Sequence, residues 1–74
     1  MGQVKNQKLM EQIARKIKSL RGKSGLSQEA VYHDTGIHIG RIEAGQSNIT
    51  VSTLDAICTY FDTDLETFFV EIKK

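Results

Sequence analysis

The chain has 74 residues, of which 39% are hydrophobic and 26% are charged, and its formal net charge is +1. A chain of this length buries only about 60% of its unfolded surface, so we expect one small domain over residues 1–74, with a flexible N-terminus (1–5) and a C-terminal tail (71–74). The single cysteine excludes an internal disulfide, and no apolar run reaches the roughly 20 residues of a membrane span. We therefore expect a soluble cytoplasmic protein that does not enter a membrane.

Charge is distributed unevenly along the chain. Residues 1–24 contain seven Lys or Arg and one acidic residue, whereas residues 25–74 contain three Lys or Arg and eight Asp or Glu. This asymmetry could orient the molecule on a polyanion, although an ordinary solvated helix face has the same composition. Both interpretations stay open at this point.

Hydrophobic spacing predicts five helices and no strand, because apolar residues recur at intervals of three and four. The first helix is expected over residues 6–23 and is followed by Gly25 as its stop. Its inner stripe should consist of Leu9, Ile13, Ile17 and Leu20, with Met10 and Ala14 beside them. The second helix starts after Ser27, whose hydroxyl is suited to an N-cap, and runs to about residue 33 or 34.

The remaining helices are also marked by their ends. Thr35 and Gly36 form a turn, and a short third helix follows that ends at Ala44, before Gly45 as an αL cap. Thr50 is suited to be the N-cap of a fourth helix over 51–61, with an inner stripe that consists of Val51, Leu54, Ile57, Cys58 and Phe61. Asp64 caps a last helix, whose apolar residues are Leu65, Phe68, Phe69 and Ile72.

Several segments match a known family in order and in spacing. They are Leu20-Arg21, Gly25-Leu26-Ser27-Gln28-Glu29, Arg41-Ile42-Glu43-Ala44-Gly45, Thr53-Leu54, Ile57-Cys58 and Asp64-Leu65-Glu66-Thr67-Phe68-Phe69. Through them nearly the whole chain resembles the Cro and lambda-repressor type of helix-turn-helix domain, also called the xenobiotic-response-element family. The resemblance implies an all-α, five-helix, lambda-repressor-like fold whose second and third helices form the helix-turn-helix.

The resemblance also implies a function and a partner. It indicates a transcription regulator of bacterial or mobile-element type that binds specific sequences of double-stranded DNA as a homodimer. It favours a repressor, while the sequence leaves repression and activation both open. Gln28 matches the glutamine that holds a DNA phosphate at the positive start of the second helix, and Ser27 and Asn48 are the other expected phosphate contacts.

Further roles follow from the same resemblance. Arg41 matches a position that reaches base edges from the recognition helix, and Thr35 and His38 are the other expected base contacts. Arg21 and Glu43 match an inward-facing ion pair that ties the first helix to the end of the third. The expected dimer surface contains Phe69 and Ile72, because the last helix carries more apolar surface than one short helix can bury.

Two departures from the family pattern affect this interpretation. Between Gln28 and Arg41 the chain is three residues shorter than is usual. If these residues are missing from the second helix (a trimmed second helix), Thr35 becomes the N-cap of a full third helix. If they are missing from the third helix, Gly36 ends the second helix and Arg41 makes most of the base contacts. We favour the trimmed second helix. The loop at 46–49 also lacks the Lys or Arg common there, which predicts a shallower salt dependence of DNA binding.

The residues disfavour an enzyme. Gly22-Lys23-Ser24 mimics the end of a phosphate-binding loop, but Ile17 stands where that motif requires a glycine, and a helix precedes it where a strand is needed. His33 and His38 lack a third ligand for a metal site. We predict no catalytic activity, no cofactor, no metal and no small-molecule substrate.

The competing hypothesis is a protein-interaction module that uses the same fold without specific DNA readout. The acidic second half of the chain would suit such a role. Charge placement distinguishes the two hypotheses. DNA binding is favoured if Gln28, Arg41 and the basic side of the first helix share one face, and protein binding if Glu29, His33 and Asp34 dominate that face.

Overall fold

The computed structural model describes residues 6–72, and these residues form five helices and no strand. The helices are α1 (Gln7–Ser24), α2 (Gln28–Thr35), α3 (Ile39–Glu43), α4 (Val51–Tyr60) and α5 (Leu65–Ile72). The predicted all-α, five-helix architecture is confirmed. The expected flexible N-terminus and residues 73–74 of the expected tail lie outside the described residues, whereas residues 71–72 belong to α5.

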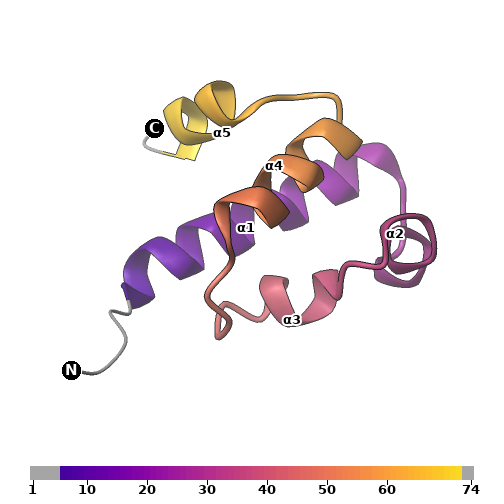
Figure 1. Cartoon of the computed structure of the whole chain (residues 1–74), viewed down its shortest axis with the longest axis horizontal. Coiled ribbons are helices and arrows are strands. Elements are labelled where there is room, and N and C mark those ends of the chain that lie inside the picture. The colour runs from indigo at the N-terminus through magenta and orange to yellow at the C-terminus, as the bar shows by residue number, and fades with distance from the viewer. Residues whose placement is uncertain (1–5, 73–74) are drawn as a thin grey trace.

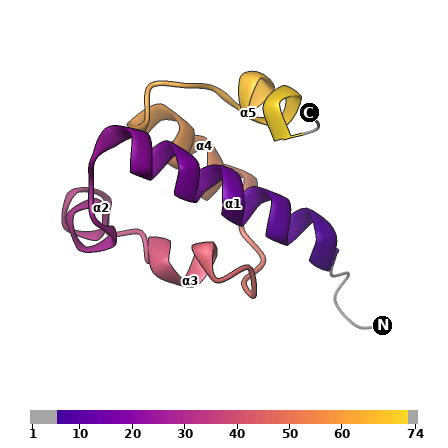
Figure 2. The same ribbon diagram turned by 180° about the vertical axis from the view of Figure 1, so that it is seen from behind.

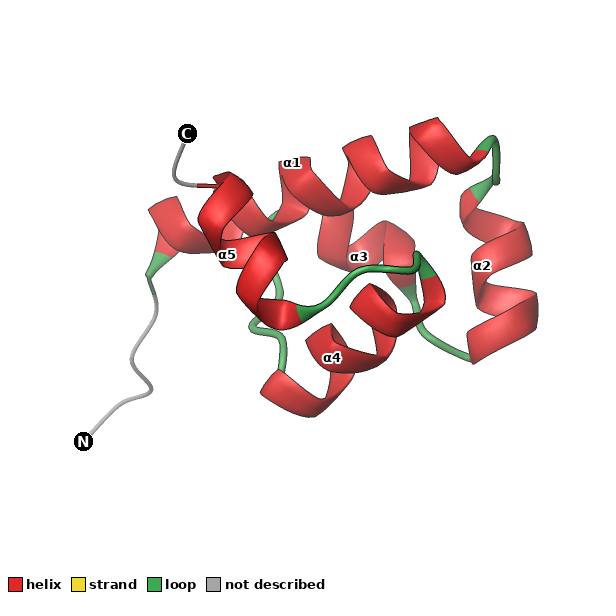
Figure 3. Cartoon of the chain, turned by 90° about the horizontal axis from the view of Figure 1, so that it is seen from above, coloured by secondary structure: helices red, strands yellow, loops and turns green. Residues whose placement is uncertain are grey.

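The long helix α1 runs through the middle of the molecule. In Figure 1, α5 lies along one edge of the molecule, α3 along the opposite edge and α2 at one end. The view from behind shows α1 crossing between α5 and α3 (Figure 2). Seen from above, α3 is visible between α1 and α4, and the connection from α4 to α5 passes back over α4 (Figure 3). The arrangement therefore presents α3 and α5 on different sides of the same central helix.

Four of the five helices begin at a residue whose side chain accepts a hydrogen bond from the backbone N–H three positions later. These residues are Asn6, Ser27, Thr50 and Asp64. Each such cap satisfies one of the backbone donors that a helix leaves without a partner, and is worth about 1 kcal/mol. The predicted caps at Ser27, Thr50 and Asp64 are confirmed. The exception is α3, whose N-cap His38 makes no capping bond with its side chain.

The core is built around one face of α1. The fully buried side chains come from every helix, and the largest of them are Phe68, Ile17, Ile39, Ile57, Val31 and Cys58. Cys58 carries a free thiol, and burial, together with the charges of Asp55 and Asp64, raises its pKa. It therefore acts as a small core residue, as the sequence pattern predicts.

Two predicted core positions are wrong. Leu9 is 36% exposed, because the buried stripe of α1 follows Met10, Ile13, Ala14 and Ile17 and leaves Leu9 at its edge. Val51 is 72% exposed, since it is the first residue of α4 and the helix meets the core only from Leu54 onward. In both cases the apolar residue has a helical spacing from a buried residue, Leu9 from Ile13 and Val51 from Leu54, but lies in the first turn of its helix and outside the packed stripe.

The preference for a trimmed second helix is also wrong. Helix α2 extends over eight residues to Thr35, and Gly36 ends it with a φ of 73° and a hydrogen bond from its N–H to the Tyr32 carbonyl. The shortening is absorbed by α3, which has five residues. The cause is burial: Ile39 is 1% exposed and Ile37 also packs against the core, and two residues that are two positions apart face the same side only in a non-helical segment.

We predict that Ile57→Ala lowers the free energy of unfolding by about 2 to 5 kcal/mol, because it removes a side chain that is 1% exposed and leaves a cavity. Urea denaturation followed by circular dichroism measures this loss. Val51→Ala is the matched control on the same helix and should change the free energy by less than about 0.5 kcal/mol. Equal losses in the two variants would contradict the assignment of the core.

Candidate nucleic-acid interface

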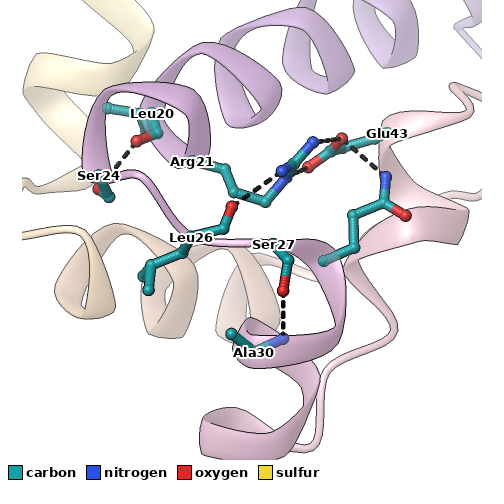
Figure 4. Close-up of polar contacts among 8 residues, drawn as sticks. Leu20, Arg21, Ser24, Leu26, Ser27, Ala30 and Glu43 are labelled. Atoms are coloured by element: carbon teal, nitrogen blue, oxygen red, sulfur yellow. Dashed lines mark hydrogen bonds and ion pairs between the residues drawn. The ribbon is translucent and has the colours of Figure 1, made fainter.

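An ion pair joins the end of α1 to the end of α3. The Arg21 Nε lies 2.6 Å from Glu43 Oε2, and Nη2 donates to Oε1 at 2.9 Å, so the guanidinium holds the carboxylate with two parallel bonds. The remaining guanidinium nitrogen of Arg21, Nη1, donates to the Leu26 carbonyl at 2.9 Å, so all three nitrogens of this fork-shaped group are bonded (Figure 4). The structure thus brings together the two residues that the family resemblance pairs, and it adds the loop before α2 to their contact.

This pair is largely withdrawn from solvent. The side chain of Glu43 is 4% exposed and that of Arg21 is 17% exposed. Burial by itself raises the pKa of Glu43, but the hydrogen bonds from Arg21 and Gln28 and the charges of Arg21 and Lys18 outweigh it, so the pKa lies below its ordinary value of 4.5. The carboxylate therefore stays charged and fixes the C-terminal end of α3 against α1.

Gln28, the first residue of α2, is in contact with the same carboxylate. Its Nε2 donates to Glu43 Oε1 at 3.0 Å, across the gap between α2 and α3. The residue as a whole is exposed. Its side chain is thus held over α3 at the positive N-terminal end of α2, where backbone N–H groups favour an anion. The sequence pattern alone does not reveal this contact with Glu43.

Arg41 is the basic residue that α3 presents to solvent. It is exposed, and within residues 6–72 its guanidinium has no ion-pair or hydrogen-bond partner. Its two neighbours in the helix face elsewhere, since Gly40 lies under the Gln28 side chain and Ile42 packs against the core. The five donors of the Arg41 fork are therefore available to an external acceptor.

His38 and Tyr32 form an aromatic pair beside the start of α3. Their ring centroids lie 4.7 Å apart with an interplanar angle of 32°, and Tyr32 is 47% exposed. The exposure of Tyr32 shows that its ring lies beside the His38 ring at the surface and not in the core. The signal that could have found it is its place just before the turn, where an aromatic side chain can reach across to the next helix.

The other predicted contacts are placed less favourably. The Thr35 hydroxyl donates to the Val31 carbonyl at 2.7 Å and accepts from the Ile37 N–H at 3.0 Å, so it belongs to the last turn of α2 and does not cap α3. The Ser27 hydroxyl accepts from the Ala30 N–H and keeps its own proton to donate. Asn48 is exposed in the loop after α3. Within residues 6–72, no hydrogen bond or ion pair joins Thr35 or Asn48 to Gln28 or Arg41.

Basic residues of α1 are divided between two sides. The positive charge of Lys18 helps to lower the pKa of Glu43 in α3, whereas Lys16 forms an ion pair with Glu71 of α5 at 2.6 Å. Asp34 is engaged elsewhere, since it accepts from the Tyr60 hydroxyl at 2.6 Å and lies 3.3 Å from His33 Nδ1. Gln28 and Lys18 thus both act on the Glu43 carboxylate at the end of α3, two positions after the exposed Arg41.

A family model for helix-turn-helix proteins matches residues 17–68, which include α2, α3 and α4 in full. The chain belongs to the Cro and lambda-repressor type of helix-turn-helix family. Members of this xenobiotic-response-element family are DNA-binding transcription regulators. A search of curated proteins and a search of solved structures find no significant match.

Two features are absent from residues 6–72. No three His, Cys, Asp or Glu side chains lie close enough to hold a metal ion. None of the helices is long and apolar enough to cross a membrane.

We predict that Glu43→Gln lowers the free energy of unfolding by about 3 kcal/mol at pH 7, because it leaves the Arg21 guanidinium without its counter-charge. The folded-state pKa of Glu43 is depressed, so its contribution is complete above the unfolded pKa and is lost as the pH falls through the folded value. The difference between wild type and Glu43→Gln should therefore shrink below about pH 5.

Urea titrations at a series of pH values measure this difference. Asp34 and Asp64 also have lowered pKa values, Asp34 mainly through the Tyr60 hydroxyl and Asp64 mainly through the Thr67 N–H. Both residues are present in each protein, so their contributions cancel in the comparison. A difference that stays constant down to pH 3 would show that the ion pair does not stabilise the fold.

Proposed function

We propose that this protein binds specific sequences of double-stranded DNA by placing α3 in the major groove. In this proposal it is a cytoplasmic transcription repressor of bacterial or mobile-element type and acts as a homodimer. The observation that carries the proposal is the exposed Arg41 guanidinium, which has no ion-pair or hydrogen-bond partner among residues 6–72 and lies on a helix whose end is tied to α1 by Arg21 and Glu43. The family match supports DNA binding in general and leaves the finer points to experiment.

Arg41 supplies sequence readout in this proposal. An arginine fork matches the O6 and N7 acceptors of guanine in the major groove, and a good bidentate contact discriminates against the wrong base by about 1 to 3 kcal/mol. His38 is the second base contact, and its ring is oriented by Tyr32. The shortness of α3 concentrates readout on these two positions, since Ile39, Gly40 and Glu43 are occupied by packing, by Gln28 and by the ion pair.

Phosphate contacts would set the orientation of α3 in the groove. Gln28 and Ser27 lie at the N-terminus of α2, where the backbone favours an anion, and Asn48 lies in the loop after α3. All three are neutral side chains, so they release few counterions on binding. To these we add Lys18 of α1, whose positive charge acts on Glu43 at the end of α3.

The repressor role is supported by the resemblance to the Cro and lambda-repressor type. A domain that fills the major groove with α3 excludes other proteins from the same base pairs, which is sufficient for repression. A protein-interaction module is the alternative function, and it becomes the preferred one if no duplex is enriched in the following selection.

We predict that selection from a random duplex pool enriches a defined motif with the wild-type protein. Arg41→Ala should relax the motif at the position that Arg41 contacts, because about 1 to 3 kcal/mol of discrimination there is lost. Gln28→Ala should weaken binding to all sequences alike, because a phosphate contact carries no base identity. The matched control is Arg15→Ala, which changes an exposed arginine on the α5 side of α1 and should leave the motif intact.

Self-association is proposed through α5. Phe69 is 37% exposed and lines a hollow of about 440 Å³ with Leu65, Glu66 and Val70. Ile72 lines a different hollow, together with Gln12, Arg15 and Lys16, so the two residues expected to form one dimer surface belong to neighbouring surfaces of α5. We therefore place the centre of the dimer contact at Phe69 and Val70. Ile72 lies at the edge of this contact in the proposal.

We predict that Phe69→Glu shifts the protein from dimer to monomer in sedimentation equilibrium at micromolar concentration. The added charge would be buried in an apolar contact, and Glu66 lies in the same hollow and repels it. Val51→Glu, at another exposed apolar residue, should leave the dimer intact. A wild-type protein that sediments as a monomer at these concentrations would refute dimerisation through α5.

A further inference from the structure

We propose that Gly40 is a positioning residue for DNA binding: its missing side chain creates the place in which the Gln28 amide is held ready for a DNA phosphate. This inference rests on the proposed function. Family resemblance points to Gln28 as a phosphate contact, whereas the role of Gly40 comes from the structure. Gly40 lies in α3 directly before Arg41, on the side of the helix that faces the N-terminus of α2.

The space above Gly40 is occupied by the Gln28 amide. A Cβ built on Gly40 would lie 2.9 Å from Gln28 Oε1, 3.4 Å from its Cδ and 3.8 Å from its Nε2. A real Cβ does not approach an oxygen this closely, so any other residue at position 40 would displace the amide. The atoms that would have to move form the end of a flexible side chain, and the backbone of α2 and α3 can stay in place.

The other side of the amide is held by Glu43. Gln28 Nε2 donates one of its two protons to Glu43 Oε1 at 3.0 Å, and the carboxylate is itself fixed by the Arg21 fork. One N–H proton of the amide is therefore bonded to Glu43, and the amide oxygen lies against Gly40 of α3. The second N–H proton remains available to donate. Because its orientation is set before DNA arrives, binding a phosphate does not have to order this side chain.

Glycine at this position is otherwise unfavourable. Within a helix it destabilises relative to alanine, and α3 has only five residues and no side-chain cap. Gly40 has no positive φ that would require glycine, unlike Gly36 and Gly45. Contact with Gln28 is therefore the local reason for a glycine here.

The test is Gly40→Ala. We expect its melting temperature to equal or exceed that of the wild type, because alanine favours the helix. We also expect its affinity for every duplex to fall about two- to tenfold, the cost of ordering or losing one side-chain contact, with an unchanged sequence preference. Gly22→Ala is the matched control, since a Cβ at that helical glycine meets nothing within 4 Å, and its affinity should equal that of the wild type.

Two further measurements separate positioning from other causes. In Gln28→Ala/Gly40→Ala the duplex affinity should equal that of Gln28→Ala, because both changes act on the same contact. Replacing the contacted phosphate by a neutral methylphosphonate should weaken binding of the wild type and have little effect on Gly40→Ala. The ¹⁵N side-chain resonance of Gln28 should shift in Gly40→Ala even without DNA.

Each outcome bears on the proposal in a distinct way. Wild-type affinity in Gly40→Ala, or losses that add in the double variant, would overturn the positioning role, the latter because the added methyl group would then meet DNA directly. Failure of the wild type to bind any duplex would overturn the proposed function and this inference with it. A shifted Gln28 resonance with unchanged affinity would overturn the inference alone.

Discussion

The bond between Arg21 and Glu43 is the interaction on which the candidate interface depends. An isolated helix of five residues has no stability of its own in water, because nucleation costs more than so few hydrogen bonds return. Helix α3 is instead held at its start by Ile39, which is 1% exposed, and at its end by the buried Glu43 carboxylate. The guanidinium of Arg21 also binds the Leu26 carbonyl, so one side chain fixes the end of α3 and the approach to α2.

This anchoring determines which residues α3 can present. Ile39 and Ile42 face the core, Glu43 faces Arg21, and Gly40 faces Gln28, so Arg41 is the residue left on the outer side. The carboxylate of Glu43 connects the two roles, because the oxygen that receives Arg21 Nη2 also receives the Gln28 amide. The stability of α3 and the orientation of the Gln28 amide therefore both depend on the buried carboxylate of Glu43, and a substitution of Glu43 affects both.

Features encoded locally were predictable from the sequence. The caps at Ser27, Thr50 and Asp64 and the glycine stop at Gly25 depend on a few adjacent residues. The extent of α3 was not predictable in this way, because local capping rules favour Thr35 as its N-cap, whereas the observed start at Ile39 depends on packing Ile37 and Ile39 against the core together. The contact between Gln28 and Glu43 links residues fifteen positions apart and requires the empty space above Gly40, which no local rule describes.

The brevity of α3 limits how much information it can carry. Five residues at a rise of 1.5 Å extend over about 7.5 Å, the length of roughly two base pairs. Two base pairs distinguish only about 16 combinations, whereas a genome offers about a million or more competing sites. A single copy of the chain would therefore bind mostly to competing sites. A helix this short needs a second source of sequence specificity, either a symmetric second half-site or the sequence-dependent bendability of the duplex between the contacts.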